Sequence, residues 1–232
     1  MDAITGSQAD NLAGGHRARL RKRLLEGGGE GLHDHEIVEY LLALAIPRRD
    51  TKPLAKQLIA YYGSFAALLT ADAENIARQP GMGETSTAAL KIVQAAALRM
   101  LSEPVRDMPI LASWQSLLDY LRADMAHLTT ERVRVLYINS KNMLIRDEVA
   151  GEGSIDQAPI YVREVIRRAI DLGAAGMILV HNHPSGDSTP SRQDITLTRE
   201  IIEAGKRLGI NVHDHVIIGK DGFSSMRSAG LI

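Results

Sequence analysis

The sequence contains no cysteine among its 232 residues. This absence excludes disulfide bonds, cysteine-ligated zinc and thiol catalysis, and it fits a protein of the reducing cytoplasm, which is where we expect this one. A tight metal site would have to use histidine nitrogens and carboxylate oxygens instead. The chain has eight histidines, so it has the ligands for such a site.

Aromatic residues, long apolar runs and net charge are also scarce. Aromatics make up 4% of the chain, so the core must consist mainly of Leu, Ile, Val, Ala and Met. No apolar run reaches the roughly 18 residues of a transmembrane helix. The first fifteen residues lack the basic-then-apolar pattern of a signal peptide, so we expect no membrane association. The net charge of −1 argues against a polybasic nucleic-acid-binding protein.

The first hundred residues are predicted to form an all-α helical bundle. Apolar residues recur there at helical spacing, and almost every connection is short. Three consecutive glycines at 27–29 end the first helix, Asp34 is the expected N-cap of the second, and Pro47 ends that helix. We expect the helices at residues 17–25, 35–46, 54–62, 65–69, 72–77 and 85–100.

The pattern changes after residues 102–110, a stretch with two prolines, three charges and no apolar period. We place the boundary there, with a helical domain at 1–105 and a second domain at 106–232. The second domain is predicted to be α/β (α+β) with a mixed central sheet. Its helices are expected at 114–125, at 161–172 and within 189–208, and its strands at 131–140, 143–149, 177–180, 211–219 and 223–226.

The sharpest feature of the second domain is a group of metal-ligand residues. His181 and His183 follow a wholly apolar strand, and alternate residues of an extended chain point the same way. Asp194 lies eleven residues after His183, in the first turn of a helix that Ser191 is expected to cap. Two imidazole nitrogens and one carboxylate oxygen are a normal ligand set for catalytic Zn²⁺, with water as the fourth ligand.

Each part of this group also has an ordinary structural interpretation. A lone H-x-H at a strand end can be two unremarkable histidines, and Ser191-x-x-Asp194 has the spacing of a helix capping box. A second H-x-H, His213 and His215, lies on the last long strand. It could be a rival ligand pair, but no third ligand follows at a suitable spacing, which favours a structural or near-site role.

The complete spacing H-x-H-x₇-S-x-x-D resembles the signature of the JAMM metalloprotease domain, also called JAB or MPN. The similarity extends further, because HNHPSGDSTPSRQD, LGINVHDHVIIG, HRARLRKRLL and PGMGETSTAAL resemble segments of the RadC family. It covers roughly residues 15–232, nearly the whole chain.

The resemblance implies a zinc-dependent hydrolase that cleaves peptide or isopeptide bonds in a peptide or protein substrate. His181, His183 and Asp194 would hold Zn²⁺, Glu131 would act as the general acid/base, and Ser191 would stabilise the oxyanion. Glu131 can also be interpreted as a solvated carboxylate at a strand start. Glu164, on the helix before the apolar strand, is the other candidate for the general base.

The helical domain offers a second class of function. Residues 80–83 (PGMG), within residues 75–100, resemble a helix-hairpin-helix turn, in which the N–H groups of Gly81 and Gly83 would contact a DNA phosphate. Glu84 and Thr87 depart from that pattern, so a structural turn or a protein-docking surface is the alternative. A DNA-binding accessory protein in repair or recombination, with a structural or nucleolytic metal site, is therefore the competing hypothesis.

Overall fold

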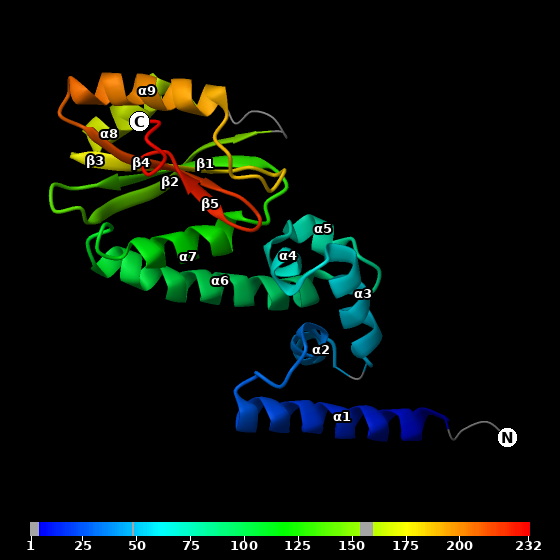
Figure 1. Ribbon diagram of the computed structural model, residues 1–232. Coiled ribbons are helices and arrows are strands. Elements are labelled where there is room, and N and C mark those ends of the chain that lie inside the picture. Colours follow the sequence, from blue (N-terminus) through cyan, green and yellow to red (C-terminus); the bar gives the residue numbers. More distant parts are fainter. Residues whose placement is uncertain (1–4, 48, 154–159) are drawn as a thin grey trace. The chain divides into compact units, whose positions relative to one another are not determined.

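The computed structural model describes residues 5–47, 49–153 and 160–232, and Figure 1 labels their helices and strands. The chain forms two compact units, Met1–Ala97 and Leu98–Ile232. The division falls inside one long helix, N-terminal to the boundary expected after residue 105. Each unit is described by itself.

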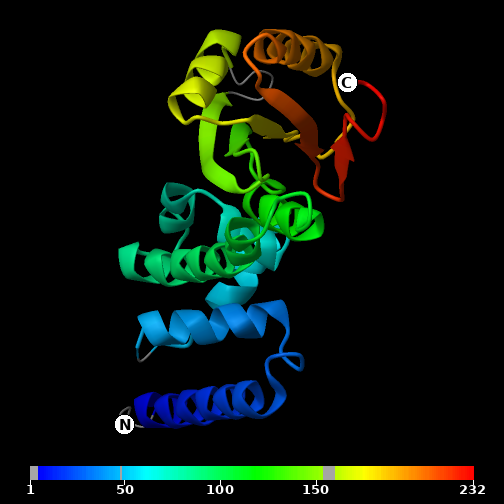
Figure 2. The ribbon, with the colours of Figure 1, turned by 90° about the vertical axis from the view of Figure 1, so that its left-hand side faces the viewer.

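The first unit is entirely helical in its described residues, as the sequence predicts. The second, third, fourth, fifth and sixth helices pack around one core of buried apolar residues, among them Leu42, Leu58, Leu68 and Leu90. The first two helices are in contact, and Figure 2 shows one above the other in this unit. The helices are α1 (Thr5–Gly27), α2 (Asp34–Ala45), α3 (Lys52–Tyr62), α4 (Phe65–Thr70), α5 (Ala73–Ala77) and α6 (Glu84–Asp107).

The helical region differs from the prediction in three details. The N-cap of α2 is His33 rather than Asp34, and the Glu36 carboxylate accepts the His33 N–H at 3.0 Å. Helix α1 begins at residue 5 rather than 17, an extension that nothing in the described side chains explains. Helix α6 continues through 102–107 and contains Pro104, because Val105 is fully buried in the core of the second unit and its burial outweighs the hydrogen bond that proline removes.

The second unit contains a five-stranded mixed sheet in the order β2-β1-β3-β4-β5, which confirms the predicted mixed sheet. The hairpin β1–β2 and the pairs β1–β3 and β4–β5 are antiparallel, whereas β3–β4 is parallel. The strands are β1 (Glu131–Ile138), β2 (Leu144–Gly153), β3 (Gly176–Asn182), β4 (Asn211–Ile218) and β5 (Phe223–Ser225).

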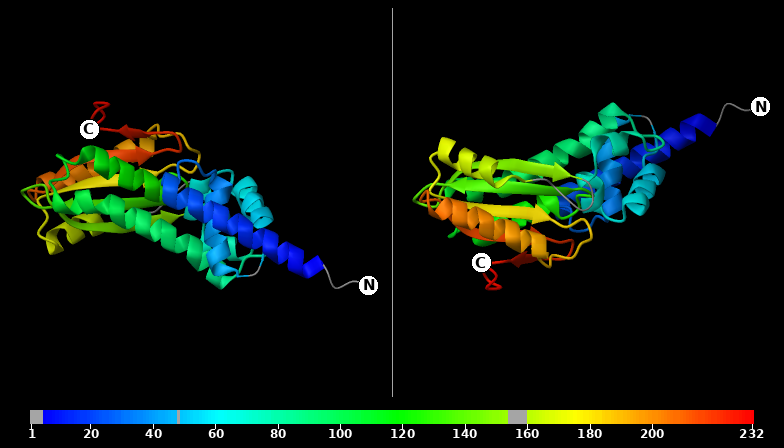
Figure 3. Two further views of the ribbon diagram at one scale, coloured as in Figure 1. Left: turned by 90° about the horizontal axis from the view of Figure 1, so that it is seen from below. Right: turned by 90° about the horizontal axis from the view of Figure 1, so that it is seen from above.

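Helices cover both faces of this sheet. Helices α8 (Val162–Asp171) and α9 (Arg192–Lys206) lie over one face, as the right-hand view of Figure 3 shows. Helix α7 (Trp114–Met125) packs on the opposite face. Strand β3 is buried throughout. Its Ile178 and Val180 lie in the core between the sheet and α7, and its Met177 and Leu179 lie in the core between the sheet and helices α8 and α9. Because Leu179 faces α8 and α9, strand alternation directs His181 to the same side.

Candidate metal centre

The first part of the centre lies where β3 ends. His181 is 1% exposed and is paired with Val133 across the β1–β3 ladder. His183 lies two residues further on, just past the strand, and is partly exposed. The two imidazoles therefore leave the sheet together, as the sequence alternation predicts.

The start of α9 supplies the carboxylate. Ser191 is the N-cap, and its Oγ accepts the Asp194 N–H at 3.1 Å while Asp194 Oδ2 accepts the Ser191 N–H at 2.7 Å. This is the capping box that the spacing allowed as an alternative. Capping and ligand geometry do not compete here, because the cap fixes the orientation of the carboxylate so that Oδ1 faces His181 and the capping oxygen Oδ2 also faces His183.

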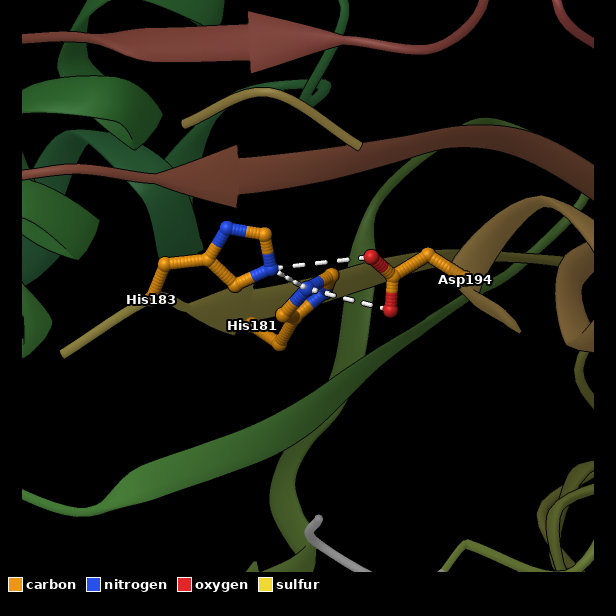
Figure 4. A group of neighbouring side chains, drawn as sticks. All are labelled: His181, His183 and Asp194. Carbon is orange, nitrogen blue, oxygen red and sulfur yellow. Dashed lines mark hydrogen bonds and ion pairs between the residues drawn. The ribbon is translucent and has the colours of Figure 1, made fainter. Parts of the chain in front are cut away.

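The three side chains meet, and Figure 4 shows both imidazoles pointing toward the Asp194 carboxylate. The Nε2 atoms of His181 and His183 are 2.9 Å apart. Asp194 Oδ1 lies 3.4 Å from Nε2 of His181, and Oδ2 lies 3.5 Å from Nε2 of His183. Within the described part of the chain, these residues form a group whose possible ligand atoms all lie within 4.8 Å of one another.

The chemistry of this donor set fits a divalent cation. Nδ1 of His183 is 2.7 Å from the backbone carbonyl oxygen of Asp187, which can only accept, so the ring hydrogen of neutral His183 lies on Nδ1. Its Nε2 then carries a lone pair that faces a second imidazole nitrogen and a carboxylate. Such acceptors repel one another unless a cation or a proton lies between them, and His₂Asp is a ligand set typical of Zn²⁺.

The ionisable groups of the centre influence each other strongly. Burial raises the pKa of the Asp194 carboxyl, but the hydrogen bonds that His181 and His183 donate to it when their rings are protonated outweigh this effect and hold the pKa far below its usual range. The carboxylate in turn raises the pKa of His183 through its hydrogen bond, and the charge of Glu131 adds a smaller increase. Asp194 is therefore a carboxylate at neutral pH, as a metal ligand must be.

Glu131 opens β1 as predicted and is partly exposed. Strand alternation places it on the face of Val133, which pairs with His181. The buried side chain of Asn182, between the two histidines, holds this strand start. Its Oδ1 accepts the Arg132 N–H at 2.9 Å and its Nδ2 donates to the Thr130 carbonyl at 3.0 Å, so it binds both peptide groups that flank Glu131.

The remaining candidate residues have other surroundings. The rival base Glu164 forms ion pairs with Arg163 at 3.4 Å and Arg167 at 3.1 Å on the charged face of α8. Ser191 is exposed, and although its Oγ accepts the capping N–H, its O–H hydrogen is free to donate elsewhere.

The second H-x-H pair is split by an irregularity in the sheet. Between Met177 and Ile178 the β3–β4 register shifts, and His213 has no partner residue on β3. A bulge of this kind breaks the alternation of side chains, so the two rings do not share one environment. His215 lies 2.7 Å from His181, whereas His213 lies against Gly176 and lines an open pocket with Trp114. The near-site role that the sequence allowed applies to His215.

One of the two glycines in the turn at residues 80–83 has a left-handed backbone. Gly81 adopts a φ of +87°, and an Arg49 guanidinium nitrogen lies 3.3 Å from its carbonyl oxygen. The N–H of Gly83, which was expected to contact a phosphate, donates to Ser86 Oγ at 2.9 Å. Glu84 is the first residue of α6.

The mixed sheet between helices, with two histidines and an aspartate at one end, defines a domain of the JAMM-like (JAB) class. The family model of the RadC-like JAB domain matches residues 111–231. A UPF0758 protein of Rhodobacter capsulatus is 47% identical over 213 residues, which are 92% of this chain and 100% of that protein. Another UPF0758 protein, from Ruegeria pomeroyi, is 46% identical over 94% of this chain and 97% of its own length. The chain belongs to the RadC family.

None of the helices in the described residues combines the length and the apolar character that crossing a membrane requires.

Proposed function

We propose that this protein is a metal-dependent hydrolase, a zinc metallopeptidase that cleaves peptide or isopeptide bonds in the cytoplasm. The observation that carries the proposal is the convergence of the acceptor atoms of His181, His183 and Asp194 on one point beside a strand that begins with Glu131. The membership in a JAB-domain family supports the reaction class. The absence of cysteine supports the location.

A bound Zn²⁺ would supply a Lewis acid that polarises the substrate carbonyl and lowers the pKa of a water ligand. The chain's own residues do the rest of the chemistry. Glu131 accepts a proton from the attacking water and returns it to the leaving amine. The O–H of Ser191 donates to the developing oxyanion, a contact worth about 3 kcal/mol in comparable sites. Asn182 keeps Glu131 in place by binding the peptide groups on either side of it.

Replacing Glu131 by Gln tests this assignment. The amide cannot accept the proton, so turnover of a peptide or isopeptide library should fall by about 10²- to 10⁴-fold while the zinc content stays unchanged. Glu164→Gln is the matched control, because it removes the rival carboxylate from the charged face of α8. A Glu131→Gln variant that cleaves as fast as wild type would contradict the mechanism, and a slow Glu164→Gln variant would move the base to α8.

DNA binding by the helical unit, with a structural or nucleolytic metal site, is the alternative function. It is favoured by the positive φ of Gly81 and by the Arg49 guanidinium beside that turn. The internal hydrogen bond of the Gly83 N–H and the charge of Glu84 oppose it. Titration with duplex DNA at several salt concentrations separates the two functions. An affinity that falls steeply with salt indicates several phosphate contacts, whereas flat or absent binding supports the hydrolase alone.

A further inference from the structure

One histidine of the second H-x-H pair, His215, is in direct contact with the candidate metal centre. His215 is 3% exposed, and its Nε2 lies 2.7 Å from Nδ1 of His181. Its other ring nitrogen, Nδ1, lies 2.6 Å from Oγ1 of Thr198, which is fully buried on α9. Both nitrogens of this buried ring are therefore used, and neither points at the space between His181, His183 and Asp194.

The hydrogen-bond chain continues beyond Thr198 and ends at a backbone carbonyl oxygen, which acts only as an acceptor. Thr198 Oγ1 is 2.5 Å from the backbone carbonyl oxygen of Asp194. A carbonyl oxygen can only accept, so the threonine hydroxyl hydrogen is directed at it. The hydroxyl oxygen must then accept from His215, which places the His215 ring hydrogen on Nδ1.

The same logic fixes the tautomer of the metal-site histidine. With its hydrogen on Nδ1, neutral His215 presents an unprotonated Nε2, which can only accept from His181. The hydrogen of His181 therefore lies on its Nδ1, and its Nε2 carries a lone pair directed at His183 and Asp194. With the His181 hydrogen on Nε2 instead, the lone pairs of His181 Nδ1 and His215 Nε2 would face each other at 2.7 Å in a buried site. A chain of hydrogen bonds thus runs from the backbone carbonyl of Asp194 through Thr198 and His215 to the ring of His181.

We propose that Thr198 and His215 are positioning residues that hold His181 in the tautomer whose Nε2 binds the metal. The second histidine motif is then not a second metal site. Instead, β4 connects the ligand on β3 to the ligand on α9. The inference rests on the proposed metal site, and it does not depend on which reaction the site performs. Partners of this kind in other metal sites change metal affinity by about 10- to 100-fold when they are removed.

Metal affinity measured by competition with a chromophoric chelator for Zn²⁺ tests the proposal. Thr198→Val removes the hydroxyl and should weaken zinc binding by about 10- to 100-fold. Thr198→Ser keeps the hydroxyl and should restore most of the affinity, which a general packing effect would not produce. His213→Phe is the matched control from the same motif and should bind zinc as wild type does. Equal affinity in wild type and Thr198→Val would overturn the proposal.

The tautomer itself is measured on the metal-free wild-type protein, which removes any dependence on a variant that folds poorly. Long-range ¹H–¹⁵N correlation spectra of the imidazoles, recorded where the rings are neutral, should place the hydrogens of His181 and His215 on Nδ1. A hydrogen on Nε2 of His181 would overturn the proposal. A protein that meets these expectations but cleaves no peptide would refute the hydrolase function and leave the positioning role intact.

Discussion

Asn182 supports the start of the strand that carries the proposed general base. It lies between the two histidines, and its single amide group binds the peptide groups on both sides of Glu131. The regular β1–β3 ladder ends at the pair Val133 and His181, so this side chain continues the connection between the strands beyond that pair. Without it, the start of β1 would have one anchor fewer beside the metal ligands.

Replacing Asn182 by Ala should therefore affect both stability and turnover. The variant leaves a backbone N–H and a backbone C=O without their partner, which costs about 1–3 kcal/mol in the free energy of unfolding. Asn139→Ala is the matched control, because Asn139 Oδ1 also binds two backbone N–H groups, those of Lys141 and Met143, at the other end of β1. Denaturant unfolding and peptide hydrolysis should show both variants destabilised but only Asn182→Ala slow in turnover. Equal slowing in both would show that Asn182 acts through general stability alone.

At this scale the sequence predicts the ligand residues but not their supporting partners. Strand alternation and the spacing of a helix start are local properties, so they suffice to bring His181, His183 and Asp194 together as candidates. Thr198 and His215 depend on the register between β3 and β4 and on the seating of α9, which no local pattern encodes. Asn182 is the exception, because an amide at the end of an otherwise apolar strand must find hydrogen-bond partners when it is buried, and this signal could have predicted its structural role.

At the scale of elements, the loop between β3 and α9 packs so closely against Gly219 that only glycine fits at this position. A Cβ at Gly219, just past β4, would collide with the carbonyl oxygen of Gly186 and would lie 3.0 Å from the backbone nitrogen of Ser188. Both atoms belong to backbone, which cannot move aside as the end of a flexible side chain can. The close approach positions the loop that connects the histidines to Asp194.

Gly219→Ala should displace this loop. We expect a loss of about 1–3 kcal/mol in the free energy of unfolding and a weaker affinity for zinc, because overpacking forces the backbone to shift. Gly222→Ala is the control from the neighbouring β4–β5 turn, where an added Cβ meets nothing within 4 Å. Thermal unfolding and zinc titration of both variants test this. A Gly219→Ala variant as stable and as tight in zinc binding as Gly222→Ala would show that the loop is not held here.

An ion pair between Arg23 and Glu36 connects helices α1 and α2, and its contribution to stability depends on pH. The guanidinium of Arg23 donates to both oxygens of Glu36 at 2.8 and 3.0 Å, and this pairing lowers the pKa of Glu36 from 4.5 to about 2. A carboxyl whose pKa is lower in the folded state stabilises the fold above its unfolded pKa. That contribution is lost as the pH falls from about 4.5 through about 2.

Comparing wild type with Glu36→Gln isolates this contribution. The variant should be less stable than wild type at neutral pH, and the difference should shrink as the pH falls through the range of about 4.5 to about 2. Gln keeps an oxygen that can accept the His33 N–H, so the helix cap is preserved. Thermal unfolding midpoints across that range provide the measurement. A difference that stays constant with pH would mean that the ion pair does not stabilise the fold.

Most elements could be predicted because their signals are local. The amphipathic period of α7, the glycine that ends α3 and the apolar run of β3 each lie within one segment. The helical 102–107 segment was missed because proline and charge suggest a break, whereas the burial of Val105 that opposes it is a tertiary effect. The shift at Met177 and Ile178 was missed for a similar reason, since a bulge appears only when two strands are paired.

At the scale of the whole molecule, the candidate chemistry belongs to one of two compact units. Every residue of the candidate metal group lies in the second unit, which also contains the match to the JAB-domain family. The relatives cover both units, since they align with 92% and 94% of this chain. The sequence predicts the change from helices to a mixed sheet because composition and periodicity change together near residue 105. The position along the continuous helix α6 at which one unit ends and the next begins depends on packing, so the sequence pattern does not reveal it.

The metal content of the protein purified without added metal tests the central claim most directly. Elemental analysis should find about one zinc per wild-type chain and almost none in Asp194→Ala or in Asp194→Asn, whose amide keeps an oxygen for the helix cap. Asp187→Asn, on the same loop, should keep its zinc, because the backbone carbonyl of Asp187 rather than its carboxylate contacts His183. Zinc absent from wild type, or equal in wild type and both Asp194 variants, would contradict the account.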